Sequence, residues 1–225
     1  MIPSEILSQV GAPITALTQI TFQCQRCGAC CRDRISAPII LTGYDMYKLA
    51  GALGMRSTMD LIETRIISVS QTSSGLPICV LSVTPDGVCC LLEGRDCAVH
   101  EAKPAVCALY PLGRIYDAEE RRYTYIQPHG NRCAGSSKGC AMAAMQWLDG
   151  TKEDEQLYAA CEQAYAEVVK FFLEITNDHY LERAFSRTIW ALFGGFNPRK
   201  PFLPQLEENI RGLRPLLKKA VRKSR

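Results

Sequence analysis

The sequence predicts a mainly α-helical protein with small β elements, in which a loop-rich, cysteine-cluster metal-binding domain is followed by a helical C-terminal part. Two observations predict this class. All of the twelve cysteines except Cys161 lie between Cys24 and Cys140, and apolar residues recur at helical spacing in the last third of the chain. We therefore expect a cysteine-cluster domain over residues 1–137 and a helical extension that packs on it over residues 138–225.

Two short helices are expected in the first part. Thr42 precedes the segment YDMYKLAGAL and Ser57 precedes TMDLIETRII, and each offers a hydroxyl that can cap a helix start. The segments LPICVLSV (76–83) and RRYTYIQ (121–127) are rich in β-branched and aromatic residues, which favours short strands. Their pairing is not predicted.

Helices are expected throughout the second part. CAMAAMQWL (140–148) predicts a first helix, and Thr151 with Asp154 resembles a capping box at the start of a second. Asn177 or Asp178 is expected to cap a third helix that ends near Gly194 and Gly195. A last helix is expected from about Leu203, with an apolar stripe made of Leu206, Ile210, Leu213 and Leu217.

Composition narrows the class of protein. The chain is 47% hydrophobic and 22% charged, which is typical of a globular protein, and no stretch reaches the roughly 20 apolar residues of a membrane span. A net charge of +3 argues against a nucleic-acid partner. We interpret the basic residues of the final helix as a solvent-exposed face, and a protein partner stays open. Glycine-rich phosphate loops, dinucleotide fingerprints and nucleophile elbows are missing from the sequence.

The location expected is the cytoplasm. The first twenty residues lack the basic start and the unbroken apolar stretch of a secretory signal. In a reducing compartment, clustered thiols serve as metal ligands rather than disulfides.

The strongest signal is CQRCGACC, which places four thiols at residues 24–31. Cys24 and Cys27 have the spacing of a metal knuckle, and Gly28 permits the left-handed backbone that follows one. Such a pair is half of a tetrahedral site, so further ligands should come from the second group of cysteines, which contains Cys89, Cys90, Cys97, Cys107, Cys133 and Cys140. Neighbouring side chains tend to diverge, so Cys30 and Cys31 are expected to face two centres, or one binds while the other packs.

A long-range ligand set is energetically feasible. Closing the loop between Cys31 and Cys89 costs about 3.6 kcal/mol by its length, whereas zinc at a structural site supplies about 10 to 16 kcal/mol. Zinc sites and [4Fe-4S] clusters both use four thiolates, so the residues leave open one metal, two metals or a cluster.

These motifs resemble the YkgJ-type cysteine-cluster family, which has a CxxCxxCC signature and is described as zinc- or iron-chelating. CQRCGACC matches the first cluster, and GVCCLLEGRDCAVHEAKPAVCALYPLG matches the second. The resemblance implies eight ligands, namely Cys24, Cys27, Cys30, Cys31, Cys89, Cys97, Cys107 and Cys133. The sequence departs from the family pattern at Leu91, His100 and Lys103. These departures change none of the eight cysteines.

Other candidate residues have weaker support. We interpret Cys79, Cys90, Cys140 and Cys161 as small buried residues rather than ligands, although Cys90 or Cys140 could substitute for one of the eight. His129 and, less so, His100 lie close enough along the chain to a ligand to bind metal, whereas His179 falls on an expected helix. Asp45 and Glu101 match family positions and could orient ligands, or could simply cap a helix or form an ion pair. Tyr110, Tyr116, Tyr123 and Tyr125 could line a pocket or belong to the core.

Two functions follow from the cysteines. The first is an intracellular metalloprotein whose cluster binds zinc or iron, with a [4Fe-4S] cluster or two metal centres as variants. The alternative is an iron-sulfur-dependent enzyme, because flagellin lysine N-methylases carry a similar cluster; no methyl-donor site is identified in the sequence. Thiol redox chemistry is a third reading, but so many nearby thiols favour metal capture.

The ligand assignment makes a first testable prediction. Replacing Cys27 or Cys107 by serine should lower the metal content per chain and the solubility together, because each change removes one thiolate. Elemental analysis of the purified variants measures this, and full occupancy in both would contradict the assignment.

Overall fold

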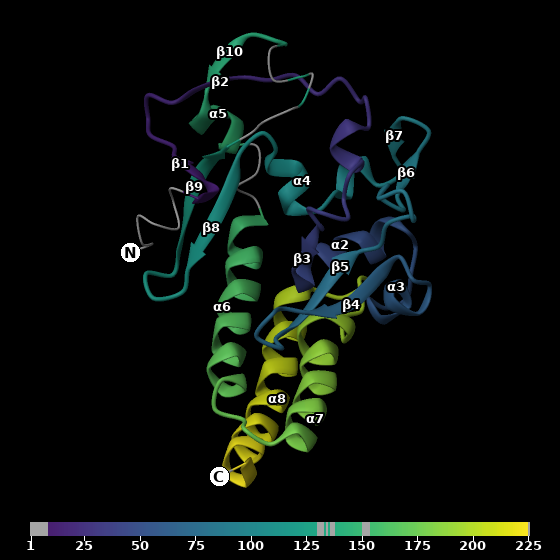
Figure 1. Cartoon of the computed structure of the whole chain (residues 1–225), viewed down its shortest axis with the longest axis vertical. Coiled ribbons are helices and arrows are strands. Elements are labelled where there is room, and N and C mark those ends of the chain that lie inside the picture. Colours follow the sequence, from purple (N-terminus) through teal and green to yellow (C-terminus); the bar gives the residue numbers. More distant parts are fainter. Residues whose placement is uncertain (1–8, 130–132, 134, 136–137, 150–153, 225) are drawn as a thin grey trace.

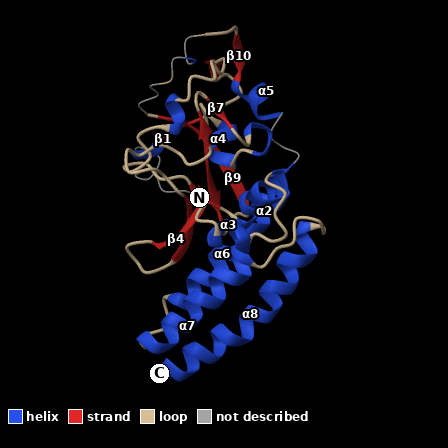
Figure 2. Ribbon diagram, turned by 90° about the vertical axis from the view of Figure 1, so that its right-hand side faces the viewer, coloured by secondary structure: helices blue, strands red, loops and turns tan. Residues whose placement is uncertain are grey.

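A computed structural model describes residues 9–129, 133, 135, 138–149 and 154–224. Helices make up 46% and strands 19% of it, so the predicted fold class is confirmed. Figure 1 shows two tiers: helices α6 (Glu155–Phe172), α7 (Asp178–Ile189) and α8 (Phe202–Ser224) run side by side below, and short strands and loops lie above. The perpendicular view in Figure 2 shows the same division.

The first expected helix is present as α2 (Gly43–Ala52). Thr42 caps it, and Asp45 completes a capping box by accepting a hydrogen bond from the backbone N–H of Thr42. The second, α3, is shorter than expected, spanning Met59–Glu63. Ser57 still organises its start, since its hydroxyl donates to Asp60 at 2.8 Å.

Both expected strands are present, and the structure supplies their partners. Strand β5 (Pro77–Leu81) lies between β3 (Ile40–Leu41) and β4 (Ile67–Gln71), and β9 (Arg122–Pro128) lies between β1 (Gly11–Pro13) and β8 (Gly113–Asp117). All of these pairs are antiparallel.

The helix expected over residues 140–148 is wrong in its first turn. Residues Ala141–Ala143 form strand β10, which pairs with β2 (Gln19–Thr21), and helix α5 begins only at Ala144 and ends at Asp149. The backbone groups of residues 141–143 bond to a distant strand, so a tertiary contact overrides the local helical preference.

The C-terminal helices follow the prediction closely. Asn177 caps α7, its side chain accepting a hydrogen bond from the N–H of His179. Helix α7 continues into a π-helical segment, η5 (Trp190–Gly194), that stops at Gly195. The four residues of the predicted α8 stripe, Leu206, Ile210, Leu213 and Leu217, are all buried. Thr151 of the expected capping box lies outside the described residues, and the segment it precedes is helical from Glu155.

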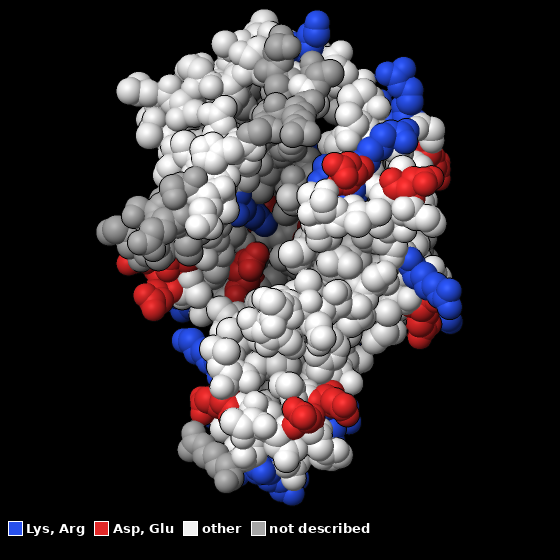
Figure 3. All heavy atoms as spheres, in the orientation of Figure 1, with Lys and Arg blue, Asp and Glu red and all other residues white. Residues whose placement is uncertain are grey.

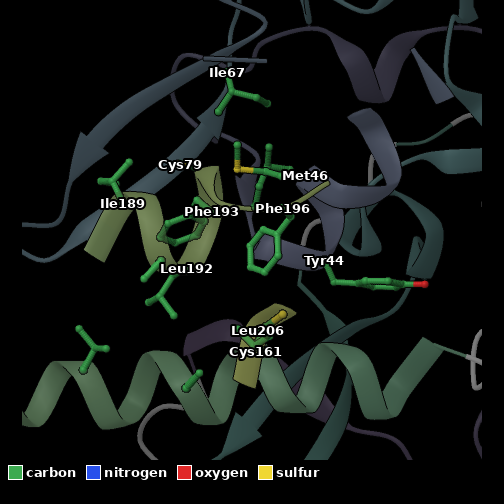
Figure 4. Packing of buried hydrophobic residues seen from close by; sticks show 14 of the residues in the cluster. Tyr44, Met46, Ile67, Cys79, Cys161, Ile189, Leu192, Phe193, Phe196 and Leu206 are labelled. Carbon is green, nitrogen blue, oxygen red and sulfur yellow. The ribbon is translucent and has the colours of Figure 1, made fainter. Parts of the chain in front are cut away.

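One large core joins the tiers. Figure 4 shows its centre, in which the η5 region packs between two layers; the labelled residues are Met46 and Cys79 above, Leu192, Phe193 and Phe196 in the middle, and Cys161 and Leu206 below. The same core therefore contains side chains from both sides of residue 137. The division at residue 137 stays a prediction. No helix of the described residues is long and apolar enough to cross a membrane.

Two glycines of α2 give a test of this packing. A Cβ atom at Gly43 would overlap the carbonyl oxygen of Leu192, whereas one at Gly51 would meet only Pro198 at 3.6 Å. We expect Gly43→Ala to lower the free energy of unfolding by about 1 to 3 kcal/mol through overpacking. Gly51→Ala should raise it by up to about 1 kcal/mol, because alanine is the better helix former. Urea denaturation measures both, and equal effects would contradict the close approach of α2 to η5.

Candidate metal centre

The first cysteine segment forms a tight turn. Gly28 has a φ of 69° and precedes a short 3-10 helix, η1 (Ala29–Cys31), closed by a hydrogen bond from the N–H of Cys31 to the oxygen of Gly28. A side chain at Gly28 would also press on Leu92 at 3.2 Å. The left-handed backbone predicted at this glycine is thus confirmed, and it turns the four thiols of residues 24–31 around one loop.

Backbone contacts connect this loop to the second cysteine group. The N–H of Cys89 donates to the oxygen of Cys31 at 2.8 Å, and a hairpin of β6 (Leu92–Glu93) and β7 (Asp96–Cys97) follows. After the 3-10 helix η2 (His100–Ala102), helix α4 (Ala105–Leu109) carries Cys107. The elements of the second cysteine group, α4, β6 and β7, lie in the upper tier in Figure 1.

A single cavity of about 110 Å³ collects the expected ligands. All eight line it: Cys24, Cys27, Cys30, Cys31, Cys89, Cys97, Cys107 and Cys133. The four cysteines interpreted as non-ligands do not line it. Cys79 and Cys161 are buried in the core, while Cys90 and Cys140 are exposed. The predicted burial is therefore confirmed for Cys79 and Cys161 and wrong for Cys90 and Cys140.

Cys30 and Cys31 lie closer together than expected. Their sulfur atoms are 4.0 Å apart and both line the cavity. The expected divergence applies to extended backbone, whereas these residues occupy a 3-10 turn. Two thiolates on one zinc, at Zn–S distances of about 2.3 Å, are about 3.8 Å apart, so the pair can serve the same ion.

The donor set fits zinc or iron in type and number. Thiolates are preferred ligands of zinc and of iron-sulfur centres, and eight are enough for two four-ligand sites. As they lie, no three His, Cys, Asp or Glu side chains of the described residues converge on a single point where they could hold an ion. The thiols instead surround the cavity.

Nearby cations favour the thiolate form at one position. A hydrogen bond from the Cys31 thiol lowers the pKa of Cys30 to about 6, although burial raises it. The positive charges of Arg34 and Lys103 also lower this pKa. Arg34 is fixed by a 2.7 Å hydrogen bond from its Nε to the oxygen of Cys30. Burial raises the pKa of Cys107 to about 12. Since the thiolate is the ligand form, binding at Cys107 must displace a proton.

His100, rather than the favoured candidate His129, lies at the cysteine cavity. His100 lines the cysteine cavity, whereas His129 is exposed at the end of β9 and does not line it. Burial, followed by the charges of Lys103 and Arg26, lowers the pKa of His100, which favours the neutral imidazole that binds metal. His179 lies on α7, as expected.

An aromatic wall closes part of the cavity. Phe22 packs edge-on against Tyr110 at 5.5 Å and against Trp147 at 5.3 Å, and all three line the cavity. Of the four tyrosines considered from the sequence, Tyr110 alone belongs to this wall. Tyr116 and Tyr125 instead reach α6, where their hydroxyls donate to Gln163 and Glu155.

The sequence reasoning missed several of the residues around the thiols. Phe22 and Trp147 carry no spacing signal because they come from elements distant in the chain. Arg34 and Lys103 lie within four residues of Cys30, Cys31 or Cys107 in the sequence. This spacing could have predicted that positive charges lie close to the thiols.

Asp45 is 2% exposed and acts as a cap rather than as part of the cavity lining. One carboxylate oxygen accepts from the N–H and hydroxyl of Thr42. The other accepts from the N–H of Ala105 at 2.8 Å and from the Tyr158 hydroxyl at 2.9 Å. Asp45 therefore joins α2 and α6 to the start of the helix that carries Cys107. Glu101 is exposed on η2, outside the cavity lining.

Comparison with known proteins gives one match. A sequence model of the family described as "CxxCxxCC: Putative zinc- or iron-chelating domain" matches residues 23–146, more than half of the chain. Among curated proteins and solved structures, none is significantly similar to the chain.

Asp45 gives the prediction for this site. Asp45→Asn should lower the free energy of unfolding by about 3 kcal/mol, because an amide nitrogen cannot accept the buried hydrogen bonds of Ala105 or Thr42. It should also lower metal content, since the N-terminus of α4 loses its anchor. Asp60→Asn is the matched control, because Asp60 also caps a helix but is distant from α4. Urea denaturation and elemental analysis test this, and retention of metal by Asp45→Asn would contradict the link to Cys107.

Proposed function

Because the chain belongs to the CxxCxxCC family of zinc- or iron-chelating domains, we propose that its eight clustered cysteines hold zinc or iron as a resident metal centre. The observation that supports this is the shared cavity: thiols from five separate stretches of chain line one space of about 110 Å³. Cys89, Cys97, Cys107 and Cys133 are distant from residues 24–31 in the sequence, so local spacing alone does not bring them to the same cavity. Bound metal supplies the cross-links that these irregular segments otherwise lack.

The surroundings suit a negatively charged centre. Arg26, Arg34, Arg95 and Lys103 lie at the cavity or against its backbone, and they can offset the charge of metal-bound thiolates. Phe22, Tyr110 and Trp147 restrict water on another side. A protein-filled ligand shell of this kind is typical of a structural or metal-handling site.

We further propose that the cavity holds more than one metal or a cluster. Eight thiolates exceed the four that one zinc takes, and a [4Fe-4S] cluster also uses four. A cytoplasmic location is part of the same proposal, since a reducing compartment keeps thiols available. The iron-sulfur-dependent lysine N-methylase activity stays an alternative prediction that requires an iron-sulfur centre.

Protein purified without oxygen tests the proposal. We expect zinc or iron in stoichiometric amount; colourless protein with zinc supports zinc sites, and brown protein with iron and acid-labile sulfide supports a cluster. The first result would also remove the basis of the methylase alternative. Metal-free, folded protein from metal-supplemented cells would contradict the proposal.

Adjacent cysteines provide a matched pair for the ligand assignment. Cys89 lines the cavity, whereas Cys90 is exposed and its thiol donates to the oxygen of Ile66 at 3.5 Å. Cys89→Ser should lose metal, and Cys90→Ser should keep it. Equal metal content in the two variants would show that position in the cavity does not decide binding.

A further inference from the structure

A second, polar cavity of about 290 Å³ lies next to the cysteine cavity. Helix α2, the η2–α4 segment, β8 and the start of α6 surround it. His100 and Lys103 line both cavities. Figure 3 shows the molecule hollowed on this face, with a basic and an acidic side chain inside the hollow.

Cations from three separate elements converge on this cavity. Lys48 comes from α2, Lys103 from the turn before α4, and Arg114 from β8. Two carboxylates, Glu101 and Asp154, also line it. Asp154 is already neutralised, since it pairs with Lys48 at 3.2 Å and accepts a hydrogen bond from the Tyr44 hydroxyl.

The remaining charges favour an anion. Three cations and two carboxylates line the cavity, so its lining carries one positive charge in excess. The Asp45 carboxylate does not line the cavity, and it accepts its four hydrogen bonds from Thr42, Ala105 and Tyr158.

Arg114 is fixed in place without a carboxylate partner. Its guanidinium lies between two aromatic rings, 4.3 Å from the centre of Tyr123 and 4.4 Å from that of Tyr158. Within the described part of the chain it forms no ion pair. A guanidinium has five N–H donors in a rigid fork, so these donors are preorganised for a planar or tetrahedral oxyanion.

The volume limits the ligand. A water molecule occupies about 30 Å³ of liquid, so the cavity holds about ten water volumes. It lies just below the roughly 300 to 1,000 Å³ of sites for drug-sized ligands. A phosphate group or a short dicarboxylate fits this size.

We propose that this cavity binds a small ligand through a carboxylate or phosphate group, held by Lys48, Lys103 and the ring-clamped Arg114. The site is distinct from the metal centre, and binding does not depend on the metal. His100 and Lys103 line both cavities, so the bound ligand lies beside the cysteines.

Isothermal titration calorimetry of the full chain as purified, at constant ionic strength, tests this with two probes, inorganic phosphate and succinate. We expect saturable binding of at least one, and the tighter probe identifies the group recognised. Arg114→Gln and Lys48→Gln should each weaken binding at least about tenfold, since each loses a charged hydrogen-bond donor. Binding of neither probe to the unmodified protein would overturn the proposal.

Arg122→Gln is the matched control, because it removes one positive charge from β9 at a residue that is 65% exposed and outside the cavity. It should bind the better probe as the unmodified protein does. Thermal unfolding and metal content, measured in parallel, separate loss of binding from loss of fold. If folded Arg114→Gln and Lys48→Gln both bind normally, or if Arg122→Gln weakens binding equally, the assigned site is wrong.

Discussion

The buried carboxylate of Asp45 is the interaction on which the cysteine-bearing region depends. It begins α2 as the partner of Thr42, anchors the first N–H of α4 at Ala105, and receives the Tyr158 hydroxyl from α6. Burying a charged group is costly unless every lone pair is used, and here four donors satisfy it. Helices α2, α4 and α6 must therefore meet around Asp45, because the buried carboxylate would otherwise lack hydrogen-bond donors.

This junction sets the place of the metal centre and of the polar cavity beside it. Helix α4 lies between two apolar clusters: Cys107 packs against the large core, while Leu109 belongs to a small cluster with Ile20 and Leu148. One end of α4 thus faces the thiols and the other side faces Arg114 and Lys48. A change in metal occupancy and a change in bound anion would both act on the segment from His100 to Ala105.

Irregular structure around the thiols is the physical reason for our proposal that a metal stabilises this region. Residues 24–31 and 89–102, which carry six of the eight cysteines, contain only the two-residue strands β6 and β7 and the single turns η1 and η2. Such segments bury little backbone in regular hydrogen bonding, and closing the loops between them costs conformational entropy. The helical tier, by contrast, buries continuous apolar stripes on α6 and α8 and is stabilised by packing.

Local signals along the chain were sufficient for helices α2, α6, α7 and α8, for the strands around residues 77–81 and 122–128, and for the list of candidate ligands. Thr42, Asn177 and the leucine stripe of α8 act over one to four residues, so propensity and periodicity describe them well. Matched cysteine spacings are equally local.

Contacts between distant residues decided the rest. Strand β10 replaces a helical turn because β2 pairs with it, and Cys30 and Cys31 meet because η1 is a 3-10 turn. His100 rather than His129 reaches the cavity, and Arg114 meets Tyr158 across two tiers. Such positions follow from packing and from buried charges such as Asp45, whose partners Thr42, Ala105 and Tyr158 are dispersed along the sequence, so no spacing within a short window can reveal them.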